Sequence, residues 1–279
     1  MLVLLELLNI LLPLGYLLAV LNYLVFFVSA PDWSRESVTP VAWTVAGLHL
    51  VYLVLETIAY RHVPIANVWE AFSFVAFALT VVYLVLESIL NDKATGVFLL
   101  APALFFQIVS SAFVTHTTEV APILRSSLFG FHVSAALLGY AAFAIAAVYG
   151  TLYILLYREL KGHRVGLIYQ RLPSLEILGR LTSTALSFGW ITLTLAIILG
   201  AVWSVSLQQS GQLTGSFLTD PKFLSTLVVW FLYGICVWGR WLFKWPTRWL
   251  AWLSIAAFVL MVFSSFAVNL FLKSFHSFI

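Results

Sequence analysis

Residues 131–157 read FHVSAALLGYAAFAIAAVYGTLYILLY and contain no Asp, Glu, Lys or Arg. A helix needs roughly 20 predominantly apolar residues to cross the hydrocarbon core of a bilayer. The stretch lacks the strict alternation of a half-buried strand, so we interpret it as a membrane-spanning helix. The rest of the chain is similar, with 62% hydrophobic residues, 9% charged residues and a mean hydropathy of +1.04. This composition excludes an ordinary soluble domain.

Eight apolar runs of this kind fit the chain. They predict an all-α, polytopic membrane helix bundle that forms one domain over residues 1–279. The first run has no basic region before it and is too long for the apolar core of a signal peptide, so we expect it to be retained. The predicted spans lie near residues 2–28, 41–60, 67–90, 96–114, 128–157, 181–207, 222–243 and 249–272.

The distribution of Lys and Arg predicts the orientation. With eight spans, only Arg61, Arg125, Lys222 and Lys273 share a side with the termini, and the other ten of the 14 basic residues lie on the opposite side. Because cytoplasmic loops carry an excess of Lys and Arg, both termini are predicted outside. We therefore expect a multi-pass protein of a prokaryotic plasma membrane. Its longest inner segment, 158–180, is expected to form a short amphipathic helix on lipid.

His132 lies at the outer end of the fifth span. Residues three, four and seven positions further on share its helical face, and these are Ala135, Ala136 and Gly139. Such a smooth strip leaves room for a flat macrocycle below the imidazole. Small residues also let transmembrane helices pack closely, and for this strip alone that simpler interpretation is favoured.

His276 closes the eighth span on the same predicted side, with Asn269 and Lys273 on its helical face. Haem propionates are anionic, and Lys273, Arg125 and Arg61 are cations at the same rim. Alternatively, Lys and aromatic residues simply anchor the helix end at the membrane interface. Two histidines on one side of the membrane shift the balance toward a pair of haem ligands.

Cysteine usage limits the chemistry. Cys236 is the only cysteine, and the chain contains no Cys-x-x-Cys-His sequence. Covalent haem attachment and dithiol reduction by this chain are therefore excluded, and we expect a bound haem to be non-covalent and b-type. The chain also lacks a Walker loop, a His-Glu-x-x-His helix and a Gly-x-Ser-x-Gly elbow, which leaves hydrolysis and nucleotide-driven pumping without support.

Six short motifs from about His62 to the C-terminus form a family pattern. In order they are VPIANVWEA at 63–71, HVSAALLGY at 132–140, LYILLYR at 152–158, GAVW at 200–203, DPK at 220–222 and FHSF at 275–278. With these motifs the sequence resembles the membrane cytochrome c assembly or haem-handling proteins of the CcsA/CcmC type. It is particularly similar to their shorter HemX-like branch.

This resemblance implies that His132 and His276 are axial haem ligands on either side of an outer, tryptophan-rich loop. The family loop carries two tryptophans before Asp-Pro-Lys, but this chain has Phe217 and Thr219 before Asp220. In the synthases the loop presents haem for thioether formation. We therefore expect this chain to bind, move or sense haem and not to be an enzyme on its own.

Three further residues are assigned to this haem site. Trp203 lies near the outer end of the sixth span and is expected to touch the haem, and Asp220 belongs to the altered loop. Glu70 starts the third span beside Asn67. Its carboxylate either accepts a hydrogen bond from the second nitrogen of a haem-ligating histidine or complements the helix dipole.

His49 offers a possible second site inside the membrane. Tyr52 and Glu56 share its helical face, and ionisable groups within a bilayer are costly and usually have a partner. One hypothesis is a haem or quinone site. The favoured alternative is a single hydrogen bond between helices, from His to Glu or from His to Tyr.

Taken together, the sequence predicts a haem-handling membrane protein that binds one haem near the outer face. Expected partners are haem, the lipid bilayer and other proteins of cytochrome c assembly or tetrapyrrole synthesis, and no nucleic acid. The alternative is a cofactor-free transporter, or a scaffold subunit of a respiratory or cytochrome c assembly complex. For a transporter, His49 with Glu56 is the modest candidate site.

Overall fold

A computed structural model describes residues 1–115, 122–163, 166–211 and 217–271. Within these ranges, eight helices are long and apolar enough to cross a membrane, as the sequence predicts. A short helix, α6, joins two of them. The helices are α1 Leu2–Val28, α2 Asp32–Tyr60, α3 Val68–Leu90, α4 Gly96–Phe113, α5 Ser127–Lys161, α6 Leu167–Arg171, α7 Leu175–Gln209, α8 Pro221–Phe243 and α9 Thr247–Phe271, with 3-10 turns η1 Pro122–Arg125 and η2 Phe217–Thr219.

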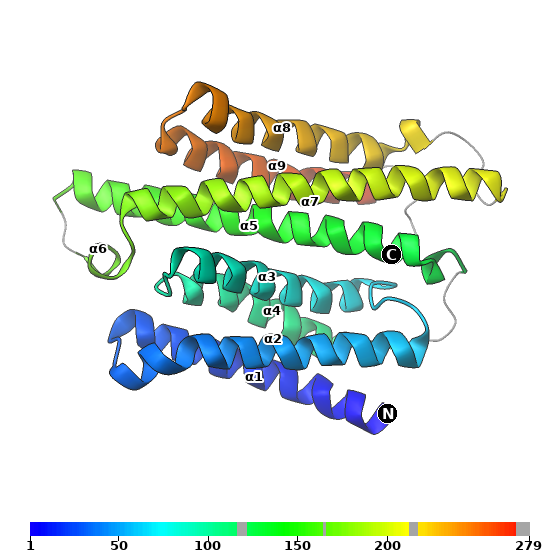
Figure 1. Cartoon of the computed structure of the whole chain (residues 1–279), viewed down its shortest axis with the longest axis horizontal. Helices are drawn as coiled ribbons and strands as arrows, with labels where there is room; N and C mark the ends of the chain where they lie inside the picture. The colour runs from blue at the N-terminus through cyan, green and yellow to red at the C-terminus, as the bar shows by residue number, and fades with distance from the viewer. Residues whose placement is uncertain (116–121, 164–165, 212–216, 272–279) are drawn as a thin grey trace.

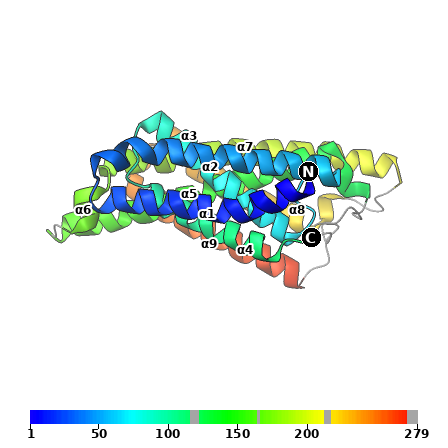
Figure 2. The same ribbon diagram turned by 90° about the horizontal axis from the view of Figure 1, so that it is seen from below.

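The long helices run side by side and form two groups of four (Figures 1 and 2). One group contains α1 to α4, and the other contains α5, α7, α8 and α9. The groups meet mainly where α3 packs against α5. The described connecting residues 29–31, 91–95, 162–163, 172–174 and 244–246 lie at one end of the bundle. We call it the basic end because it carries most of the Lys and Arg residues that the structure describes.

Several helix boundaries differ from the sequence prediction. α2 begins at Asp32 and not near residue 41, because the polar first turns are held against α1. There the buried Ser34 hydroxyl donates to Asn22 Oδ1 at 3.0 Å. At the basic end α5 extends to Lys161 and α7 begins at Leu175, so the helix expected within 158–180 is only the five-residue α6.

Close backbone contact joins α5 to α7 along their length (Figure 1). A Cβ on Gly139 would lie 3.2 Å from the Gly189 carbonyl oxygen, and one on Gly189 would lie 2.6 Å from the Phe143 ring. Side chains at these glycines would push the helices apart. The simpler interpretation of the small strip after His132 is thus confirmed at Gly139.

Glu87 joins three helices near the basic end. Only 3% of its surface is exposed. Its carboxylate accepts hydrogen bonds from the hydroxyls of Tyr23 on α1, Thr39 on α2 and Tyr83 on α3. The sequence prediction did not single out Glu87. An acidic residue inside an apolar run was the available signal, because such groups nearly always have partners within the membrane.

Candidate functional site

His132 lies in the second turn of α5, at the end of the bundle opposite the basic end. Its Nδ1 is 2.8 Å from the carbonyl oxygen of Ala196 on α7. A carbonyl oxygen only accepts hydrogen bonds, so Nδ1 carries the proton and Nε2 carries the lone pair. A metal-ligating histidine is commonly oriented through such a bond from its other nitrogen.

Gly200, one turn beyond Ala196, makes room for the imidazole. A Cβ at this position would lie 2.7 Å from Cε1 and 2.8 Å from Nδ1 of His132. Any side chain at residue 200 would therefore displace the ring. Gly200 belongs to the GAVW motif of the family resemblance. The sequence did not show that it positions His132, because this contact depends on the register between α5 and α7.

Trp203 completes this side of the site. Its ring stacks beside that of His132, with 6.1 Å between centroids and 24° between planes. The side chain is 5% exposed, and its Nε1 has no hydrogen-bond partner among the described residues. A buried, unpaired N–H is costly, so it marks a place where a ligand acceptor would gain a hydrogen bond. That Trp203 touches the ligand stays a prediction.

Trp203 belongs to an apolar cluster that lies beside His132. It brings together segments that are far apart in the chain: the connection after α2, the 3-10 turn before α5, and the facing ends of α5 and α7. Such walls exclude water from a polar centre and suit the faces of a flat aromatic ligand. Its buried members are Ile65, Leu124, Phe129, Trp203 and Leu207.

Glu70 caps α3. Its backbone N–H donates to the Asn67 side chain at 2.9 Å, and its carboxylate accepts from the Asn67 amide at 2.9 Å and from the Ala66 N–H at 2.8 Å. The helix-stabilising role is thus present. The histidine nearest to its carboxylate in the described part of the chain is His62, whose Nδ1 is 4.0 Å from Oε2. His62 is itself buried and donates from Nδ1 to the Val63 carbonyl.

Other predicted site residues occupy the same end of the bundle. Asp220 is buried and caps α8 by accepting from the backbone N–H groups of Lys222 and Phe223. Arg125 is exposed at the end of η1, just before α5. His276 and Lys273 lie outside the described residues.

His49 is fully buried among α1, α2 and α3. Its Nδ1 is 2.9 Å from the Tyr16 hydroxyl, and its Nε2 is 2.9 Å from the Ser73 hydroxyl. A hydrogen bond between His and Tyr that joins two helices, one of the simpler alternatives, is therefore present. Glu56 is also buried on α2, but its neighbour is Tyr52, and it is not a hydrogen-bond partner of His49.

Comparison of the sequence with known protein families identifies the family of this chain. The model of the cytochrome c assembly protein family matches residues 65–276. The chain therefore belongs to the cytochrome c assembly protein family. It is a multi-pass membrane protein, and its membership supports a role in cytochrome c biogenesis.

Relatives from both branches are similar over most of the chain. The protein HemX of Bacillus subtilis is 27% identical over 270 residues, which cover 94% of each chain. The protein HemX of Brevibacillus brevis is 28% identical over 196 residues, or 70% of each chain. The cytochrome c biogenesis protein CcsA of Mesostigma viride is 25% identical over 243 residues, or 78% of each chain. The resemblance to the HemX-like branch is thus confirmed.

Proposed function

We propose that the chain holds one non-covalent b-type haem at the end of the bundle where α5 begins, with His132 and His276 as axial ligands. The observation that carries the proposal is the hydrogen bond from His132 Nδ1 to the Ala196 carbonyl, since it leaves the lone pair of the neutral imidazole on Nε2. The unpaired Trp203 Nε1 beside it supplies a donor. The protein would thus handle or deliver haem in cytochrome c biogenesis, as its family membership supports.

The remaining residues have positioning roles in this proposal. Arg125 and Lys273 would pair with the propionates, because the sequence predicts both cations at the outer rim. The Glu70 carboxylate fixes the start of α3 by accepting from Ala66 and Asn67, and Asp220 caps α8. A bound haem supplies a redox-active iron. The site would face the outer side of a prokaryotic plasma membrane, and other assembly or tetrapyrrole-synthesis proteins would be its partners.

The test is the visible spectrum of the purified protein, oxidised and dithionite-reduced, beside His132→Ala and His276→Ala variants. We expect a sharp Soret band and a sharp reduced α-band that both variants weaken or lose. His163→Ala is the matched control, because His163 is exposed at the basic end, and its spectrum should equal that of the wild type.

Two outcomes would contradict the proposal. A protein that stays colourless after haem addition would remove the haem role and leave the alternative of a cofactor-free transporter or scaffold. A haem spectrum that His132→Ala leaves unchanged would show that the ligands lie elsewhere.

A further inference from the structure

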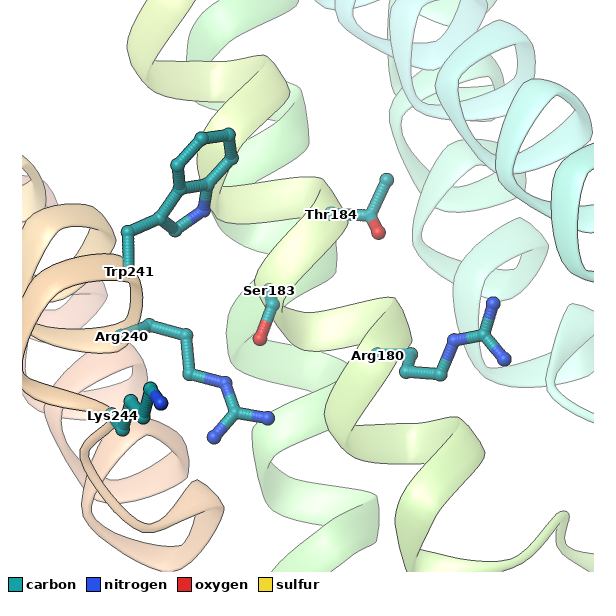
Figure 3. Close-up of a pocket in the computed structure, with 6 residues that line it drawn as sticks. All are labelled: Arg180, Ser183, Thr184, Arg240, Trp241 and Lys244. Atoms are coloured by element: carbon teal, nitrogen blue, oxygen red, sulfur yellow. The ribbon is translucent and has the colours of Figure 1, made fainter.

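A groove between α7 and α8 at the basic end, far from His132, has three cations in its lining. The groove has a volume of about 510 Å³, and Figure 3 shows Arg240 extending from α8 toward α7, while Arg180 projects from α7 on the other side of that helix. The six lining residues are Arg180, Ser183, Thr184, Arg240, Trp241 and Lys244.

These cations are not neutralised by the protein. Within the described part of the chain, no carboxylate lies within 4.0 Å of Arg180, Arg240 or Lys244. Even Glu176, one turn before Arg180 on α7, makes no ion pair with it. The lining of the groove therefore carries a net positive charge, which attracts anions.

The groove also retains unused hydrogen-bond donors. Arg240 donates from Nη1 to the Trp245 carbonyl at 3.0 Å, which fixes the guanidinium and leaves its other N–H groups available. The side chains of Arg180, Lys244 and Thr184 make no hydrogen bond to any described residue. This is the donor set that recognises a phosphate.

Two exposed apolar stripes continue from groove-lining residues toward the opposite end of the bundle. Each stripe consists of large apolar side chains three or four residues apart on one helix, and each lies on a helix that forms the groove. On α7 the exposed residues are Phe188, Ile191, Leu195, Ile198 and Val202. On α8 they are Leu224, Val228, Phe231, Ile235 and Trp238.

We propose that the groove binds the headgroup phosphate of an anionic phospholipid, with the acyl chains lying along the stripes of α7 and α8. A free phosphate ion would satisfy the cations but not the stripes, so the apolar surface favours a lipid. Trp241, with 69% of its surface exposed, lies at the junction of headgroup and acyl chains, where indole rings are favoured. Basic pockets between helices are suited to such headgroups.

The test is native mass spectrometry of the full chain in detergent, titrated with phosphatidylglycerol or with phosphatidylcholine of the same acyl chains. We expect the wild type to bind phosphatidylglycerol about tenfold more tightly. The variant Arg180→Gln with Lys244→Asn should lose this preference. Asn tolerates the left-handed backbone of residue 244, where φ is 49°.

The matched control is Lys161→Gln with Arg171→Gln. It removes the same charge from the same end but lies outside the groove, so it should keep the lipid preference within about twofold. Equal loss in both double variants, or equal binding of both lipids by the wild type, would overturn the proposal. Displacement of phosphatidylglycerol by millimolar inorganic phosphate would also overturn it, because the site would then be one for free phosphate.

Discussion

At the scale of single residues, His132 is positioned by α7 and not by its own helix. The Ala196 carbonyl fixes which nitrogen carries the proton, and the missing side chain at Gly200 leaves space for the ring. We predict that Gly200→Ala displaces the imidazole and weakens haem binding about 10-fold to 100-fold, which is the usual range when the partner that orients a metal ligand is disturbed. Haem titration followed at the Soret band measures this change.

Gly47→Ala is the control for this substitution. Gly47 lies on α2, and a Cβ there would meet no atom within 4 Å. Alanine is the better helix former, so this variant should keep haem affinity and gain up to about 1 kcal/mol of stability. If both alanine variants reduce haem binding equally, the close contact at Gly200 is not the cause.

Trp203→Phe separates a ligand contact from a packing contact. The substitution removes the buried, unpaired Nε1 donor and retains an aromatic ring next to His132. Without haem we expect the unfolding free energy to stay within about 1 kcal/mol of the wild type, because no protein hydrogen bond is lost. Haem affinity should fall severalfold. Unchanged affinity in the titration would show that the indole N–H does not bind the ligand.

At the scale of helices, Glu87 holds the basic ends of α1, α2 and α3 together. Glu87→Gln replaces an acceptor of three hydroxyl hydrogen bonds by an amide that must itself donate. We predict a loss of about 2 kcal/mol in the free energy of unfolding. Thermal unfolding in nanodiscs measures this loss.

Glu36→Gln is the matched control, since Glu36 is exposed on α2 near the same end. It should change stability by less than about 0.5 kcal/mol. If Glu87→Gln is equally mild, the three hydroxyls do not depend on the charge of the carboxylate.

The existence of the helices was predictable, because continuous apolar runs of this length have one stable form in a bilayer. Their ends were less predictable, because they depend on contacts between helices. The early start of α2 rests on the hydrogen bond from Ser34 to Asn22, and neither residue is apolar. The spacing of apolar residues along the sequence could not reveal that Ser34 and Asn22 form a hydrogen bond.

The candidate site was predictable in part, for the same reason. His132 and Trp203 were identified by residue type and predicted depth, and the structure places their rings together. The contacts of His132 with Ala196 and Gly200 depend on how α5 and α7 align, which no pattern within one helix encodes.

At the scale of the whole molecule, the orientation in the membrane remains a prediction from the basic residues. Cys236 is the only cysteine and is buried, so single added cysteines report topology cleanly. We expect a membrane-impermeant maleimide to label Gln209→Cys in intact cells, and to label Lys161→Cys only after lysis. Labelling in the reverse order would place the termini inside.

The two groups of helices have a mechanical consequence. The α5 and α7 backbones touch through glycines, and a Cβ on Gly150 would lie 2.9 Å from the Ala251 carbonyl oxygen of α9, so these helices cannot slide past one another without separating. We therefore expect α5, α7 and α9 to move as one unit. Because His132, Ala196 and Gly200 all belong to α5 and α7, a movement of the other group of helices would leave the imidazole aligned.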